Sequence, residues 1–383
     1  MSNQVVRPWS TAHPGPAAKA TLVGSRFPGY VYDHAPRNVY WETTIACDLA
    51  CKHCRADAIP FRDPLELTFE EGKALLEEIK RLGSMVILTG GDPMKRPDIF
   101  DLIAYAREIK VPVSITPSTT PTVTQGAVHR FKELGVAAMG VSLDGPTAEL
   151  HDAFRGVQGT FAHSMDALAY AREARMPVQI NTTVTADTIA HLPDMYELLK
   201  TSASPPVRRW SLFLLVPVGR GLALGMPSAE RIEKLFEWAY DTAQEAPFHI
   251  ATVEAPHYRR YYIQRKLAEG LSEEEITKLG KRLSFGMRDG NGVIFVSHQG
   301  NVFPAGFLPH PLLGNVREKS LTEIYRNSPE LAGLRDMDSL QGKCGRCEFR
   351  WSCGGSRARA YATTGSLMES DRFCLYEPSG GSA

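Results

Sequence analysis

The sequence predicts an α/β protein with a partial (β/α)6 TIM-type barrel followed by a small, loop-rich C-terminal domain. Between residues 38 and 246, apolar β-rich runs alternate six times with amphipathic helical segments. This alternation is typical of parallel strands joined by right-handed helical crossovers. Six units fall short of the eight that close a full barrel. Near residue 250 the alternation stops, which indicates a second domain.

The strands and helices follow one another in a regular order. Strands are expected at residues 38–45, 84–90, 111–117, 137–145, 177–185 and 208–218. Helices are expected at residues 68–83, 97–110, 123–135, 160–175, 192–203 and 228–246. The first helix has clear end signals, because Thr68 and Glu71 can form a capping box and Gly83 can stop the helix. In such sheets the functional residues lie at the C-terminal ends of the strands.

Three regions are expected along the chain. Residues 1–36 are rich in Pro, Ala and Ser and are predicted to be a poorly ordered lead-in. Residues 37–250 form the barrel, and residues 251–383 form the C-terminal domain. Within the latter, 256–282 is expected to be helical and 293–307 to be a hairpin that turns at Gln299-Gly300-Asn301.

Composition excludes several classes of function. The chain has 43 basic and 43 acidic residues, so an excess of positive charge for binding nucleic acid is missing. No apolar run approaches the roughly 18 to 20 residues that span a bilayer, and the N-terminus does not resemble a secretory signal. A cytoplasmic protein without membrane or nucleic-acid partners is therefore expected. Thiols stay reduced in that compartment, so grouped cysteines indicate metal binding or catalysis.

All seven cysteines fall into two groups. Cys47, Cys51 and Cys54 lie in the loop after the first strand. Three thiolates at this spacing can bind three irons of a 4Fe–4S cluster and leave the fourth iron open, as catalysis requires. Two alternatives are a zinc site with His53 as fourth ligand, or three unrelated core cysteines.

The second group contains four cysteines near the C-terminus, and an odd total of seven fits a disulfide framework poorly. Its members are Cys344, Cys347, Cys353 and Cys374. Four thiolates are a complete ligand set for a further 4Fe–4S cluster. Structural zinc is the alternative.

The first cysteine loop resembles the signature of the radical SAM superfamily, in which an aromatic residue usually precedes the third cysteine; His53 takes that place. The turn Gly90-Gly91-Asp92 resembles the family's Gly-Gly-Glu-Pro turn, which binds the amino group of S-adenosylmethionine (SAM), with Asp replacing the usual Glu. Backbone carbonyls of the turn can make the same contact. Val216, in the stretch that ends the sixth strand, is expected to border the adenine through backbone contacts.

The resemblance implies further cofactor contacts at the fourth and fifth strands. Ser142 corresponds to a serine that contacts the ribose, and Arg155 to an arginine that binds the methionine carboxylate. The alternatives are that Ser142 caps a turn and that Arg155 pairs with Asp152. Asn181 and Thr183 are expected to face the same site, although alternate strand residues also point inward for structural reasons alone. No residue is assigned a catalytic role from the sequence.

The second cysteine group resembles the C-terminal SPASM or twitch domain of many radical SAM enzymes. The two-cluster form of this domain holds an outer and an inner auxiliary cluster. The four cysteines form a complete ligand set for the outer cluster. The ligands of the inner cluster are missing, because Ala305 stands at one expected cysteine position and residues 354–357 contain no cysteine. One auxiliary cluster is therefore expected, for electron transfer or structure. Together the two clusters and SAM imply a 5′-deoxyadenosyl radical that abstracts hydrogen from a substrate, with a donor such as ferredoxin or flavodoxin supplying electrons.

Within the superfamily, the sequence of this chain most resembles the haem-pathway branch. The parallels are 40-YWETTIACDLACKHC-54, 211-SLFLLVPVGRG-221 and 353-CGGSRARAYATTG-365. This implies a tetrapyrrole whose propionate groups are modified. Tyr and Arg alternate in 257–266, which would suit a flat anionic ring, and Arg357 and Arg359 add positive charge; an ordinary surface helix is the alternative. The rival functions are a maturase for a ribosomally made peptide and a non-catalytic Fe–S or zinc scaffold.

Overall fold

The computed structural model describes residues 20–202, 207–281 and 283–378, and it confirms the predicted barrel. One mixed sheet has the strand order β12-β11-β10-β3-β4-β5-β6-β7-β8-β9. Its parallel strands are β3 (Asn38–Glu42), β4 (Met85–Thr89), β5 (Val113–Ile115), β6 (Ala138–Ser142), β7 (Val178–Val184), β8 (Val207–Leu214) and β9 (His249–Val253). The six predicted strands are β3 to β8. The seventh, β9, was not expected and carries the barrel sheet past the boundary placed at residue 250.

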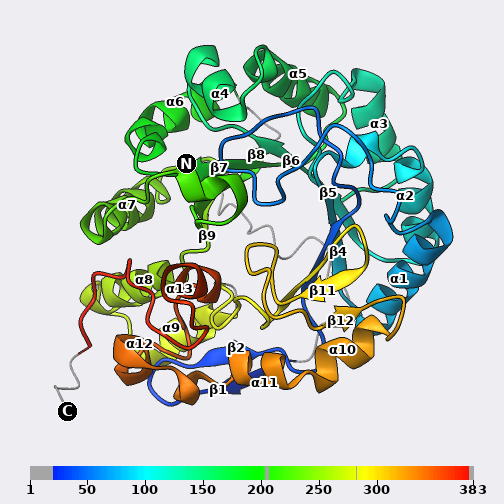
Figure 1. The fold of residues 1–383 in the computed structure, drawn as a ribbon. Coiled ribbons are helices and arrows are strands. Elements are labelled where there is room, and N and C mark those ends of the chain that lie inside the picture. The colour runs from blue at the N-terminus through cyan, green and yellow to red at the C-terminus, as the bar shows by residue number, and fades with distance from the viewer. Residues whose placement is uncertain (1–19, 203–206, 282, 379–383) are drawn as a thin grey trace.

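The helices cover the outside of this curved sheet (Figure 1). They are α1 (Phe69–Leu82), α2 (Ile99–Glu108), α3 (Gln125–Glu133), α4 (Ala148–Arg155), α5 (Thr160–Glu173), α6 (Leu192–Ser202) and α7 (Ala229–Thr242). Short 3-10 turns occur at η2 (Pro93–Lys95), η3 (Thr188–His191), η4 (Gly219–Ala223) and η5 (Met337–Ser339). The predicted capping box of Thr68 and Glu71 is confirmed at α1, and Gly83 ends that helix with φ of +67°.

Strand β7 shows why the sheet has an apolar outer face and a polar inner face. Val178, Ile180 and Val184 are fully buried in the core. Asn181 and Thr183 alternate with them and are only half-buried. Because successive side chains of a strand point to opposite faces, the half-buried polar residues line the inside of the barrel.

The C-terminal region does not form a separate sheet. The predicted hairpin is present as β10 (Val293–Val296) and β11 (Asn301–Phe303), followed by β12 (Gly314–Asn315). Strand β10 pairs in parallel with β3, so the hairpin continues the barrel's own sheet. The remaining helices are α8 (His257–Ala268), α9 (Glu273–Gly280), α10 (Leu321–Asn327), α11 (Pro329–Arg335), α12 (Gly342–Arg346) and α13 (Arg357–Thr364). Helices α8 and α13 lie on the side where the ring of strands is open (Figure 1).

The expectation of a poorly ordered lead-in is wrong for residues 20–36; residues 1–19 lie outside the described residues. Strands β1 (Thr21–Val23) and β2 (Gly29–Val31) form an antiparallel hairpin. This hairpin packs so closely on the C-terminal region that a Cβ at Gly29 would lie 1.9 Å from the carbonyl oxygen of Trp351. The side chain of Asn291 accepts a hydrogen bond from the amide of Tyr32 at 2.8 Å. These long-range contacts are not visible in the sequence.

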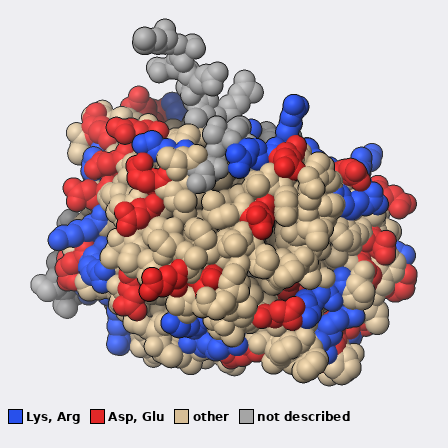
Figure 2. Space-filling model, turned by 90° about the horizontal axis from the view of Figure 1, so that it is seen from above, with Lys and Arg blue, Asp and Glu red and all other residues tan. Residues whose placement is uncertain are grey.

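The surface carries charges of both signs. In the view from above, uncharged side chains cover the middle of the molecule, and neither sign gathers into a large patch (Figure 2). Among the described residues, no helix has the length and apolar character needed to cross a membrane.

Candidate active site

The first cysteine group lies at the C-terminal end of β3, as the sequence predicts. Cys47 and Cys51 are buried and Cys54 is half-buried, and all three belong to one small apolar cluster with Leu49 and Ala58. The amide of Cys54 donates to the carbonyl of Cys51 at 3.2 Å, which closes the loop into a tight turn. Burial raises the pKa of the Cys47 thiol, an effect that a bound metal ion would oppose.

The glycine turn after β4 packs on the backbone that leads into this loop. The amide of Gly91 donates to Thr44 at 2.8 Å, and the amide of Asp92 donates to Ala46 at 2.7 Å. A Cβ at Gly91 would lie 2.4 Å from the carbonyl oxygen of Ala46, and one at Gly90 would lie 2.5 Å from that of Thr44. Both positions therefore require glycine for close backbone packing, whatever they contact in a cofactor.

The carboxylate of Asp92 is turned toward its own chain. One oxygen accepts from the amides of Met94 at 3.0 Å and Ser118 at 3.2 Å, and the other accepts from the hydroxyl of Thr120 at 3.2 Å. Burial raises the pKa of Asp92 to about 6. The side chain thus fixes the loop after β5 against the glycine turn.

Arg155 lies next to the cysteine loop, although not in the alternative pairing considered from the sequence. Its guanidinium forms an ion pair with Asp144 at 2.5 Å and lies 3.7 Å from the sulfur of Cys51. Asp152 instead accepts hydrogen bonds from the backbone amides of Gly159 and Phe161. Although burial opposes ionisation of Asp144, the charge of Arg155 holds the pKa of that carboxyl below its usual value.

Asp144 was missed by the sequence analysis. It follows β6 by two residues, and its second oxygen accepts from the amide of Thr183 at 2.6 Å. The sequence did contain one signal for Asp144, which is its position at a predicted strand end, two residues after Ser142. Ser142 and Asn181 are paired in register and both are half-buried, and the side chain of Asn181 also accepts from Gln179 at 2.8 Å.

His53 takes the aromatic position before the third cysteine. Its ring stacks on that of Phe154, with centroids 4.7 Å apart and planes inclined by 13°. Burial lowers the pKa of His53 to about 4, so the ring is neutral at physiological pH. In the structure, His53 thus packs against Phe154 of α4.

The segment that follows β8 and ends at Gly221 packs directly on the loop of Cys47, Cys51 and Cys54. Val216 is buried, and at Gly219, where φ is +53°, a Cβ would lie 2.5 Å from the carbonyl oxygen of Cys54. The side chain of Arg220 donates to the carbonyl of Cys51 at 2.9 Å, and its amide donates to that of Cys54 at 3.0 Å. Arg220, which follows β8, thus holds the cysteine loop in place. No local pattern in the sequence indicated this role.

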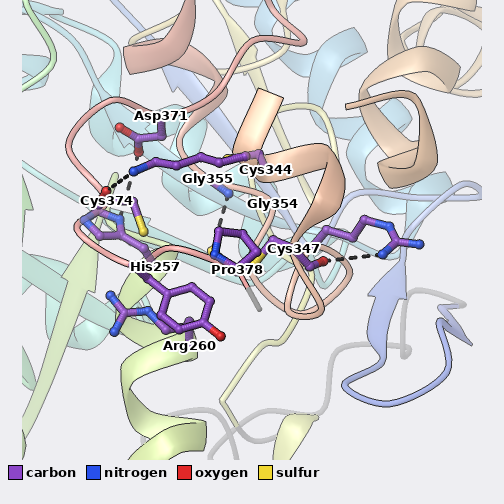
Figure 3. A pocket seen from close by; sticks show the side chains of 13 residues that line it. His257, Arg260, Cys344, Cys347, Gly354, Gly355, Asp371, Cys374 and Pro378 are labelled. Carbon is purple, nitrogen blue, oxygen red and sulfur yellow. Dashed lines mark hydrogen bonds and ion pairs between the residues drawn. The ribbon is translucent and has the colours of Figure 1, made fainter. Parts of the chain in front are cut away.

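The four remaining cysteines surround one cavity in the C-terminal region. Cys344, Cys347, Cys353 and Cys374 line it together with His257 and Arg260 (Figure 3). Burial raises the pKa of Cys347 to about 12 and also raises that of Cys353. An empty pocket would therefore hold neutral thiols.

Two arginines that interact electrostatically with Cys353 form no salt bridge in the described part of the chain. Arg259 donates to the carbonyl of Ser352 at 3.4 Å, and Arg288 donates to that of Gly286 at 2.5 Å. Burial lowers the pKa of both, to about 10 for Arg259 and about 9 for Arg288, and the charge of a Cys353 thiolate opposes this. An anionic group held by Cys353 and the other three cysteines would offset these two positive charges.

An iron–sulfur cluster fits these donors better than zinc does. Four thiolates around one cavity supply the negative charge that the two arginines lack. Across the described ranges, no three His, Cys, Asp or Glu side chains converge closely enough to hold a single metal ion. Thiolates on one tetrahedral zinc would lie about 3.8 Å apart, whereas a cluster spreads them more widely.

The basic residues expected to hold an anionic ring mostly have other partners. On α8, Arg260 pairs with Glu233 at 2.5 Å and Arg265 pairs with Asp241 at 3.0 Å. Arg359 is fully buried in an ion pair with Asp371, and Arg357 donates to backbone carbonyls. Helix α8 thus agrees with the alternative of a structural helix.

Comparison with known proteins shows the family of the chain. The family model described as the radical SAM superfamily matches residues 41–199, and the SPASM iron–sulfur cluster-binding domain matches residues 288–348. The AdoMet-dependent heme synthase of Oleidesulfovibrio alaskensis is 40% identical over 90% of this chain and 88% of that protein. The Fe-coproporphyrin III synthase of Methanosarcina barkeri is 33% identical, over 88% of this chain and 87% of that one. The crystal structure of Streptococcus suis SuiB bound to precursor peptide SuiA shares the fold, with a TM-score of 0.70, 19% identity, and coverage of 90% and 77%.

Proposed function

Since the chain belongs to the radical SAM superfamily and carries its SPASM iron–sulfur domain, we propose that it oxidatively decarboxylates propionate side chains of a haem-type tetrapyrrole. The chain is an enzyme that uses SAM and two 4Fe–4S clusters. The observation that carries the proposed substrate is the 40% identity to a heme synthase over 90% of this chain. The likeness to SuiB, at 19% identity, supports the fold alone.

The first cluster supplies the radical. Cys47, Cys51 and Cys54 would hold this cluster, which would supply one electron for the reductive cleavage of SAM and so the radical that removes hydrogen from the substrate. Arg220 holds the loop that carries these thiols, and the stacking of His53 on Phe154 packs the same loop against α4.

The chain's own residues then orient SAM. We assign the amino group of SAM to backbone carbonyls of Gly90, Gly91 and Asp92, because the Asp92 carboxylate is already engaged. Arg155, fixed by Asp144 beside Cys51, is placed to bind the methionine carboxylate.

The ribose and adenine are assigned to the inner side of the strand ends. Ser142, Asn181 and Thr183 lie on the polar inner face at the same end of the sheet. Their hydroxyl and amide groups suit the ribose, and the backbone at Val216 suits the adenine edge.

The reaction balances as follows. Each propionate loses one hydrogen atom to the 5′-deoxyadenosyl radical, then loses CO2 and one electron, and becomes a vinyl group. The electron needs an acceptor, for which the cluster of Cys344, Cys347, Cys353 and Cys374 is suited by its position in the same chain. We further propose a ferredoxin or flavodoxin as the donor to the first cluster, and the reduced cytoplasm as the compartment.

The test is an anaerobic incubation of reconstituted protein with SAM, dithionite and iron-coproporphyrin III. Mass spectrometry should detect products that have lost CO2 and H2 per propionate, together with 5′-deoxyadenosine. If 5′-deoxyadenosine forms while the tetrapyrrole is neither bound nor altered, the proposed substrate is wrong, and a ribosomally made peptide becomes the substrate to try.

A further inference from the structure

Strand β8 places one arginine on the polar inner face of the barrel. Trp210, Leu212 and Leu214 are buried on the outer face. Arg209 and Phe213 alternate with them and are half-buried on the inner face. The residues paired in register with Arg209 are Gln179 of β7 and His249 of β9, and neither is acidic.

Arg209 has no carboxylate partner among the described residues. Its Nε donates to the hydroxyl of Ser211 at 3.0 Å, on its own strand. Every Asp and Glu side chain of the protein lies within the described ranges, so the remaining residues contribute none. The charged or ionisable neighbours of Arg209 are the hydroxyl of Tyr40 and the guanidinium of Arg37; burial lowers the pKa of Arg209, and the charge of Arg37 lowers it further.

Two other buried arginines of this protein have a carboxylate partner. Arg155 is paired with Asp144, and Arg359 is paired with Asp371. Arg259 and Arg288 interact electrostatically with Cys353 of the second cysteine group. Arg209 has neither kind of partner, and an unpaired guanidinium in the protein interior is costly. A carboxylate that pairs with Arg209 would therefore have to come from a bound molecule.

The location of Arg209 suits a substrate rather than SAM. Phe213 lies near the C-terminal end of β8, and Arg209 comes four residues before it. Four residues of a strand span about 13 Å. SAM is expected at the strand ends, so Arg209 lies deeper in the barrel. Tyr40 belongs to β3, which lies five strands from β8 in the sheet order, so strands remote in the sheet approach each other at Arg209.

We propose that Arg209, with Arg37 and the Tyr40 hydroxyl, binds a substrate carboxylate deep in the barrel, namely a propionate that is not the one reacting at the strand ends. This inference rests on the proposed function, because it deepens the assignment of a tetrapyrrole with several propionates. A guanidinium is suited to a carboxylate through two parallel hydrogen bonds.

The probe is iron-coproporphyrin III, whose binding is followed by the change in its Soret band. Arg209→Gln should weaken binding by about tenfold to a hundredfold, the effect of losing a hydrogen-bonded charge pair. Formation of 5′-deoxyadenosine without substrate should be retained, because SAM is bound elsewhere. Arg208→Gln is the matched control, since Arg208 is the preceding residue of the same strand and is exposed.

A modified ligand tests the same contact without altering the protein. Wild-type protein should bind the tetramethyl ester of iron-coproporphyrin III more weakly than the free acid, and Arg209→Gln should add little further loss with the ester. Equal binding of acid and ester by wild-type protein would overturn the inference even if Arg209→Gln failed to fold. Equal losses in Arg209→Gln and Arg208→Gln would overturn it as well.

The two proposals fail in different ways. If wild-type protein converts iron-coproporphyrin III and Arg209→Gln does so with unchanged affinity, the carboxylate site is wrong and the function stands. If wild-type protein neither binds nor converts this tetrapyrrole while still cleaving SAM, the proposed function is wrong and the Arg209 assignment falls with it.

Discussion

The carboxylate of Asp144 lies 2.5 Å from the guanidinium of Arg155, and the same guanidinium lies 3.7 Å from the sulfur of Cys51. A residue after the fourth strand thus fixes a cation beside a thiol of the first loop. This relationship couples the proposed carboxylate contact of SAM to the open cluster. It also makes Asp144 a positioning residue, because it acts on the cofactor only through Arg155.

Asp144→Asn should therefore destabilise the protein and weaken SAM binding. Removing one partner of a buried ion pair leaves the other charge unpaired, which costs about 3–5 kcal/mol. Anaerobic urea unfolding measures the first effect, and the KM for SAM in 5′-deoxyadenosine formation measures the second. Asp101→Asn, at an exposed position on α2, is the control and should change neither. An unchanged KM for SAM would contradict the positioning role.

Gly91→Ala should disrupt the cysteine loop. The added methyl group would lie 2.4 Å from the carbonyl oxygen of Ala46, so the backbone before Cys47 must shift. We expect a loss of about 1–3 kcal/mol in the free energy of unfolding and strongly reduced iron incorporation at the first site. Gly126→Ala, in α3, is the control, since its nearest neighbour would be 3.9 Å away. Normal iron content in Gly91→Ala would show that the close packing is dispensable.

Glu254→Gln should flatten the pH dependence of stability. Burial and the nearby Asp289 carboxylate raise the pKa of Glu254 to about 8, and its oxygen accepts from Ser356 at 2.6 Å. The folded state thus keeps a proton that the unfolded chain releases near pH 4.3. The stabilisation is fully present below that pH and is lost as pH rises through about 8, by at most about 1.4 kcal/mol per pH unit.

The measurement for Glu254 is anaerobic urea unfolding of wild-type protein and variant between pH 5 and 8. Wild-type stability should fall with rising pH, whereas the variant should vary less and gain most at pH 8. Glu245→Gln, at an exposed site, should retain the wild-type slope. Parallel curves for Glu254→Gln and wild-type protein would mean that Glu254 is ionised in the folded state.

Cys347→Ala should separate SAM cleavage from product formation. Its thiol lines the C-terminal cavity, away from the loop that holds SAM. We expect about four irons per chain in place of about eight, retained 5′-deoxyadenosine, and no decarboxylated product. Global unfolding of this variant would indicate that the second cluster is structural instead of an electron acceptor.

Local patterns predicted much of the fold and of the first site. Alternating apolar runs located β3 to β8, and the spacing of Cys47, Cys51 and Cys54 located the loop after β3. The features that were missed depend on contacts between distant residues. Strand β9 and the hairpin of β1 and β2 are short, and they are stabilised by pairing and packing partners remote in sequence.

Side-chain partners across the fold were equally hidden. The roles of Asp144 and Arg220 arise from contacts with Arg155 and the cysteine loop, which the chain brings together only after the barrel forms. For Arg359 the expected role was lost. It was expected to add positive charge at the auxiliary site, but its charge is neutralised by Asp371 in the core. Sequence patterns identify which residues are charged, whereas pairing decides which charges remain available.

The most direct test of the account is EPR spectroscopy of the reduced, reconstituted protein with and without SAM, together with its iron and sulfide content. The account predicts about eight irons per chain and a cluster signal that changes when SAM is added. In Cys51→Ala the change should disappear while the signal of the second cluster remains. A signal that is indifferent to SAM, or zinc in place of iron at the first site, would contradict the claim that Cys47, Cys51 and Cys54 hold a cluster with an open iron.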